Sequence, residues 1–455
     1  MSSSRSSYGL SDRSVPGSDS RRRSSTQPRP NLYLRSRSQP FPLPPLIPRL
    51  VVDPLTATLV LAYVAAGVAL GMVSGLVPGL HANNFALVLA AAAADAPGPP
   101  LLLGVAMLAA GVVHTFLDAV PALALGVPDA AMAATALPGH RLVIAGRGRE
   151  AIRLSALGSG LAVAVALPLA VPVSAAMESA YPAVRDHLPL VLAAVVALLV
   201  GTEPTLRAGA VGLAAFAASA ALGWLTLDLS PAAPLAAGGM LTPLFAGLFG
   251  APVLVDALGG AGVPEQADAA VASPRRVVLG TAAAGALAGA VVGYLPGISS
   301  AIAAVVVLAA TPGTAGDRGY VVATSGVNTA NTIFALFALV AIGEPRTGVL
   351  VAFETVSAPL NLPLLVAATL LASVAGFCLV LSLGDRYLRV VGRMDYRRLS
   401  VGVLCLLVAL SWLFAGPVGA VVFAASAVLG LVPVRFGARR VHLMGVLIGP
   451  IALGL

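Results

Sequence analysis

Long runs of hydrophobic residues, separated by short polar or charged segments, fill the chain from about residue 55 to its end at Leu455. A helix needs about 20 mostly apolar residues to cross the hydrocarbon core of a bilayer. We place about ten to twelve runs of this kind along the chain, and two of them, 400–415 and 417–433, meet at Gly416-Pro417. The pattern predicts an all-α polytopic membrane protein with about 10–12 transmembrane helices.

Two ladders of glycine, each ending in a Pro-Gly pair, form the strongest internal pattern. The first ladder is Gly67, Gly71, Gly75, Pro78 and Gly79, and the second is Gly285, Gly289, Gly293, Pro296 and Gly297. Every position recurs 218 residues later. Glycine at every fourth position lets another backbone approach one helix face closely. We therefore expect two internal repeats, each with a broken or re-entrant helix at its Pro-Gly pair.

A second match follows at nearly the same offset. His114-Thr115-Phe116 and then Gly126-Val127-Pro128 align with Asn331-Thr332-Ile333 and then Gly343-Glu344-Pro345. The two matches together predict a first membrane repeat over residues 51–260 and a second over residues 275–455.

Polar, uncharged residues follow each Pro-Gly pair. A helix interrupted inside the membrane exposes backbone amides and carbonyls that can hold an anion or a cation, and many secondary transporters place their substrate there. The alternative role for the polar side chains is capping of the broken helix. The residues expected to bind substrate are Pro78, Gly79, His81, Asn83, Asn84, Pro296, Gly297, Ser299 and Ser300.

Further polar residues lie in the second helix of each repeat. His114 and Asp118 are four residues apart and share a helix face. Because an imidazole and a carboxylate are costly in an apolar run, they favour a proton or ion site, although a mutual structural hydrogen bond is the alternative. Neutral amides and hydroxyls in the other repeat suit Na⁺ or a carboxylate, or hydrogen bonds between helices. The residues expected to couple an ion are His114, Asp118, Asn328, Thr329, Asn331 and Thr332.

Composition excludes a soluble fold, since 58% of residues are hydrophobic, 10% are charged and the mean hydropathy is +0.94. Residues 1–50 differ: they are rich in Arg, Ser and Pro, and nine Arg and two Asp give them +7 of the total charge of +8. They are expected to be a disordered tail or to precede a true start near Val51. The Arg-rich loops alternate along the chain in a way that favours a cytoplasmic N-terminus.

No residue pattern typical of an enzyme occurs in the sequence. His-Glu-x-x-His, Gly-x-Ser-x-Gly and a phosphate-binding loop are all absent, and Cys378 and Cys405 lack metal-ligand neighbours. We therefore expect no catalytic residues, no metal and no cofactor, apart from a coupling ion that is Na⁺ or H⁺.

Several of these motifs together are specific to one family. Residues 71–80, His114 with Asp118, Gly126-Val127-Pro128 and the basic loop 139–156 resemble the tripartite tricarboxylate transporter large membrane subunit. Residues 285–298 resemble the second repeat of that family, and the resemblance covers about residues 55–450. Residues 129–132 and 138–140 depart from its usual pattern, so the chain resembles a divergent member.

The resemblance implies a multi-pass permease of the cell membrane that moves organic anions, such as di- or tricarboxylates, on an ion gradient. It also implies a small membrane subunit and an extracytoplasmic receptor as partners, leaves a homo-oligomer open, and gives no reason to expect nucleic acid. Two alternatives are an intramembrane enzyme or lipid-handling protein that uses His114 and Asp118, and a structural or assembly protein of the membrane.

Overall fold

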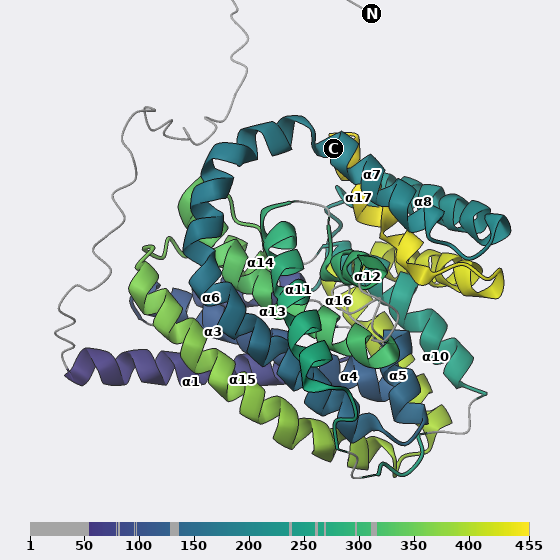
Figure 1. The fold of residues 1–455 in the computed structure, drawn as a ribbon, viewed down its shortest axis with the longest axis horizontal. Helices are drawn as coiled ribbons and strands as arrows, with labels where there is room; N and C mark the ends of the chain where they lie inside the picture. The colour runs from purple at the N-terminus through teal and green to yellow at the C-terminus, as the bar shows by residue number, and fades with distance from the viewer. Residues whose placement is uncertain are drawn as a thin grey trace, which may run out of the picture. The chain divides into compact units, whose positions relative to one another are not determined.

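The structure is a computed structural model of the chain. It describes residues 54–454 except 79, 81, 95, 97, 128–135, 236–238, 260–262, 268–269, 296–297 and 311–315. Within these residues all regular secondary structure is helical (Figure 1). The expectations for the N-terminal tail fall on residues 1–50, which lie outside the described part.

In the part of the chain that the structure describes, eight helical stretches are long and apolar enough to cross a membrane. They are α1 (Pro54–Leu76), α3 with α4 (Pro100–Leu117 and Ala119–Leu125), α6 (Gly148–Asp186), α8 (Leu206–Thr226), α11 (Arg275–Tyr294), α13 (Gly316–Ile342), α15 (Leu362–Val391) and α16 (Tyr396–Arg435). The shorter helices are α2 (Ala82–Ala94), α5 (Ala136–Ile144), α7 (Leu188–Gly201), α9 (Leu241–Phe245), η1 (Ala246–Gly250), α10 (Ala251–Ala257), α12 (Ser300–Ala310), α14 (Gly348–Thr355), η2 (Arg440–Met444) and α17 (Gly445–Ala452). The sequence predicted ten to twelve transmembrane helices of about 20 residues each. The number of candidate spans is smaller because several apolar runs form these shorter helices.

Helix α16 is interrupted at Ala415 and Gly416, which have non-helical backbone angles. Gly416 has φ of 59° and ψ of −157°, and glycine adopts positive φ without the steric cost that a Cβ brings. Pro417 follows and cannot continue the hydrogen-bond ladder. The element therefore consists of two helices, as expected from the two apolar runs on either side of this point in the sequence.

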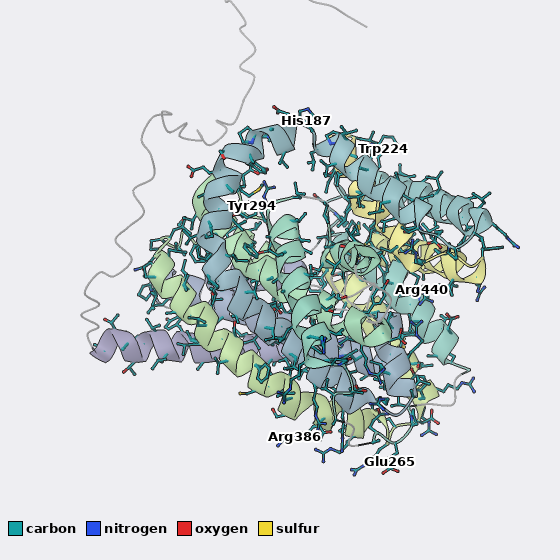
Figure 2. The ribbon with its side chains drawn as sticks, in the orientation of Figure 1. His187, Trp224, Glu265, Tyr294, Arg386 and Arg440 are labelled. Carbon is teal, nitrogen blue, oxygen red and sulfur yellow. The ribbon has the colours of Figure 1, made fainter. Side chains whose placement is uncertain are left out.

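Six helices form two groups in which each member packs on the other two. The α3 group contains α1, α3 and α15, and the α13 group contains α6, α11 and α13. In the α13 group, Tyr294 at the end of α11, labelled in Figure 2, shares a hydrogen bond of 2.7 Å with Ser174 of α6. Helices α3 and α13 are the most buried of the candidate spans, so each is the centre of its group.

The glycine ladders form the closest helix contacts in both groups. A Cβ on Gly67 or Gly71 of α1 would overlap a carbonyl oxygen of α3. A Cβ on Gly289 of α11 would lie 2.6 Å from Cβ of Ala330 in α13. Since real Cβ atoms do not approach so closely, both ladders act as close-packing faces, in agreement with their spacing.

Candidate functional site

Each ladder helix ends just before its Pro-Gly pair, and a new short helix begins just after it. Helix α1 ends at Leu76 and α2 begins at Ala82, while α11 ends at Tyr294 and α12 begins at Ser300. Pro78 is buried, and the N–H of Leu80 donates to the Val77 carbonyl at 3.3 Å.

At the second break, the hydroxyl of Ser299 accepts a hydrogen bond of 3.3 Å from the N–H of Ile302. This contact is the capping role that the sequence offered as the alternative to substrate binding. Ser300, the first residue of α12, is buried. Gly79, His81, Pro296 and Gly297 lie outside the described residues, as do the side chains of Asn83 and Asn84, so substrate binding at the two loops stays a prediction.

His114 of α3 is fully buried and is held on two sides. Its Nδ1 lies 2.9 Å from the hydroxyl of Ser74 in α1, and its ring stacks on Phe85 of α2, with 6.2 Å between the ring centroids. Phe85 belongs to the helix that follows the first break, so that helix and the imidazole are in direct contact.

Asp118 lies at the joint between α3 and α4, and only 5% of its surface is exposed. The side-chain amide of Asn328 in α13 donates a hydrogen bond of 2.7 Å to its Oδ2. Asn328 is buried to the same degree. A buried carboxylate is costly unless hydrogen-bonded, so this contact stabilises the position of Asp118 and joins the α3 group to the α13 group.

A chain of hydroxyl groups crosses the same interface. Thr115 of α3 lies 3.3 Å from the hydroxyl of Thr329 in α13. Thr329 donates to Ser159 of α6 at 2.8 Å, and Ser159 donates to the carbonyl of Ser325 at 3.2 Å. Ser325 also shares a hydrogen bond of 2.9 Å with Ser155. These contacts form three hydrogen-bonded sets. We call their residues together the polar seam: Ser74, His114, Thr115, Asp118, Ser155, Ser159, Ser325, Asn328 and Thr329.

The structure brings four of the six expected ion-coupling residues into this seam. Asn331 and Thr332 lie on the next part of α13, where the Asn331 backbone faces Gly289 of α11 and Thr332 is buried. Sequence reasoning missed Ser74, Ser155 and Ser159. Ser155 and Ser159 are four residues apart within an apolar run, and this helical spacing was the available signal.

The seam offers one carboxylate, one imidazole and several neutral oxygens. No group of three or more His, Cys, Asp or Glu within the described residues is arranged to hold a metal ion. A single buried carboxylate among hydroxyl and amide groups has the chemistry to take up a proton or a monovalent cation.

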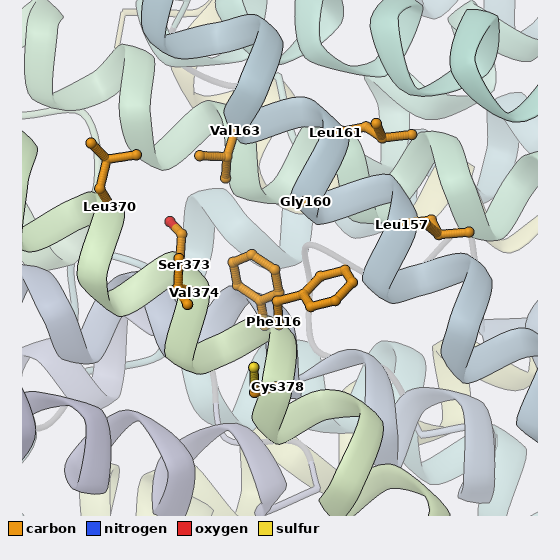
Figure 3. A pocket seen from close by; sticks show the side chains of 10 residues that line it. Phe116, Leu157, Gly160, Leu161, Val163, Leu370, Ser373, Val374 and Cys378 are labelled. Carbon is orange, nitrogen blue, oxygen red and sulfur yellow. The ribbon is translucent and has the colours of Figure 1, made fainter.

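A cavity of about 380 Å³ is lined by Phe116 of α3 and by residues of α6 and α15 (Figure 3). Its lining is apolar except for Ser373 and Cys378. It offers an anion no charged or amide donor, so we do not assign the substrate to it.

Comparison with known proteins gives one family. The family described as "Tripartite tricarboxylate transporter TctA family" matches residues 61–445. An uncharacterized protein of Methanocaldococcus jannaschii is 26% identical over 362 residues, which cover 78% of this chain and 87% of that protein. No solved structure matches the chain.

Proposed function

Because this chain belongs to the tripartite tricarboxylate transporter TctA family, and so is a membrane transporter and not an enzyme, we propose that it is a secondary-active permease for di- or tricarboxylates. A Na⁺ or H⁺ gradient drives it, and it has no other cofactor. The single observation that carries the proposal is the Asn328 contact with Asp118, because it holds a buried carboxylate between two packed helix groups.

We assign the coupling ion to the part of the seam around Asp118. Carboxylate, amide and hydroxyl oxygens are the ligands that Na⁺ prefers, and a lone carboxylate also accepts a proton. Thr115 and Thr329, the residues next to His114 and Asn328 in sequence, bring two hydroxyls to the same interface. The substrate region remains the two Pro-Gly loops with the polar residues that follow them.

The proposal includes two internal repeats, and two pairs of glycines support them. Gly126 and Gly343 each end a helix, with φ of 69° and 70°, at matched positions of the repeats. Gly158 and Gly376 are 218 residues apart. Gly158 contacts the backbone of α13, and Gly376 contacts the ring of Phe116 in α3. Matched glycines in matched roles are expected if the repeats are related by an approximate two-fold axis.

The partners that we propose are a small membrane subunit and an extracytoplasmic receptor, since the family description names a tripartite system. The orientation that we propose has a cytoplasmic N-terminus, because Arg-rich segments such as 386–398 favour the cytoplasmic side.

Uptake into proteoliposomes tests this function. The purified chain is reconstituted with and without the two proposed partner proteins, and accumulation of labelled citrate, succinate and other anions is measured with an inward Na⁺ gradient, an inward H⁺ gradient or neither. We expect accumulation of at least one di- or tricarboxylate under one gradient, and loss of that accumulation in Asp118→Asn. The matched control is Asp228→Asn, a change at an exposed loop carboxylate. Gradient-independent behaviour, or no uptake across the panel, would contradict the proposal.

A further inference from the structure

A second cavity, of about 370 Å³, lies between the ends of several helices. It is lined by Pro138, Arg141, Val305, Tyr320, Val434, Gly437, Ala438, Arg439, Arg440 and Val441. Three of these residues are arginines, and the lining contains no carboxylate. Val305 belongs to α12, the helix that follows the second break, so the cavity is beside the proposed substrate region.

Two of the three arginines are engaged elsewhere. Arg141 forms an ion pair with Asp317 at the start of α13. Arg439 contacts Glu203 at 2.7 Å and also donates to the Leu199 carbonyl at 2.6 Å. These contacts fix both side chains and balance their charge outside the cavity.

Arg440 is different, because most of its donors are not used. Only 6% of its side chain is exposed, and its Nη2 donates to Asp256 at 3.1 Å. Its Nε and Nη1 are buried, and neither has a hydrogen-bond partner among the described residues. The side chain lies beside α10 in Figure 2, where it is labelled. Buried donors without acceptors cost free energy, whereas a guanidinium that meets a carboxylate gains short, charge-assisted hydrogen bonds.

We infer that this cavity binds a soluble multivalent carboxylate, with Arg440 as its main anchor. The inference rests on the proposed function for the class of ligand, and it adds a carboxylate site apart from the polar seam. Half of the Asp256 side chain is exposed, so solvent screens its charge and leaves Arg440 with net attraction for an anion. Tyr320 is a further polar residue of the lining.

Equilibrium binding of labelled citrate to the purified protein tests the inference, in detergent and in nanodiscs made with neutral or with anionic phospholipid. We expect Arg440→Gln to weaken binding by at least about tenfold. Arg440→Lys should weaken it less, because it keeps the positive charge but not the planar guanidinium that forms two parallel hydrogen bonds to a carboxylate. The control is Arg435→Gln, an exposed arginine at the end of α16, with an expected change below about twofold.

Each other result has a defined meaning. Unchanged citrate affinity in folded Arg440→Gln, or no citrate binding by the parent chain, would overturn the inference. Displacement of citrate by anionic lipid that depends on Arg440 would make the phosphate headgroup the occupant and would also overturn it. Transport with an unaltered KM in Arg440→Gln would remove the cavity site and leave the proposed function intact. Citrate binding that depends on Arg440, without gradient-driven uptake, would keep the cavity site and contradict the proposed function.

Discussion

Asn328 and Asp118, which are 210 residues apart in the chain, meet through a hydrogen bond of 2.7 Å in the interior. The donor is an amide of α13, and the acceptor is a carboxylate at the α3–α4 joint. Asn328 lies in the central helix of its group and Asp118 directly follows the central helix of the other, so the contact depends on how the two groups fit together.

The first prediction concerns Asp118 and its partner. Replacing Asn328 with Leu removes the donor and leaves a buried carboxylate oxygen without this hydrogen bond, so we expect a loss of about 1–3 kcal/mol in stability. The double variant Asn328→Leu with Asp118→Leu should recover most of that loss, because no buried charge remains. Thermal or denaturant unfolding in detergent measures both. Equal destabilisation in the single and double variants would contradict a direct interaction.

The second prediction concerns the hydroxyl chain. Ser159→Ala and Thr329→Val each remove one side of a hydrogen bond, and a double-mutant cycle should give a coupling energy of about 0.5–1.5 kcal/mol. Ser159→Ala with Ser411→Ala is the control cycle, because the Ser411 hydroxyl bonds within its own helix. A coupling energy near zero for the first cycle would show that the chain contributes nothing to stability.

The third prediction concerns the glycine ladders. Gly71→Val and Gly289→Val each force a side chain into a closely packed helix contact, which should cost about 1–3 kcal/mol or prevent folding. Gly280→Val, on the same helix as Gly289, meets open space and should cost less than about 1 kcal/mol. Comparing yields of monodisperse protein and unfolding temperatures checks this. A fall for Gly280→Val as large as for Gly289→Val would assign the effect to helix propensity instead.

The fourth prediction concerns pH and Glu203, which lies between α7 and α8. Burial alone would raise the pKa of its carboxyl, but hydrogen bonds from Arg439 and His442 and the charge of Arg439 bring the pKa below its usual value. A lowered folded-state pKa contributes stability that is complete above the unfolded pKa, near about 4.3, and is lost as pH falls through the folded value.

We therefore expect Glu203→Gln to lower stability at neutral pH and to flatten its decline below about pH 4. Unfolding curves from pH 3 to pH 8 measure the effect. Glu265→Gln, at an exposed residue, should leave the curve unchanged. If stability falls as steeply with decreasing pH in Glu203→Gln as in the parent chain, the Glu203 carboxyl is not the cause of that fall.

Local spacing was enough to predict some features of this molecule. The apolar runs predicted an all-helical membrane protein, Pro417 separated two runs that the structure divides at Gly416, and the four-residue spacing of His114 and Asp118 placed them on one helix face. These features depend on residues a few positions apart, for which helix geometry is fixed in advance.

Features that depend on docking between distant helices were not predictable from spacing. The choice of Asn328 over Asn331 as the partner of Asp118 is set by the rotation of α13 against α3. Arg440 is one of several arginines near a helix end in the sequence, and only tertiary packing distinguishes it by burying the side chain. Ser159 likewise gains its role from the neighbouring helix.

One long helix from each half of the sequence packs in the group that is centred on a helix of the other half, and this arrangement has a mechanical consequence. Helix α6 packs on α13, and α15 packs on α3. Neither half of the sequence therefore packs as a separate unit. The two groups meet where α6 packs on α15 and α3 packs on α13. The Asp118–Asn328 and Thr115–Thr329 contacts both lie between the two groups. In the proposed function, protonation of Asp118 or ion binding there would therefore change a contact that joins the two groups.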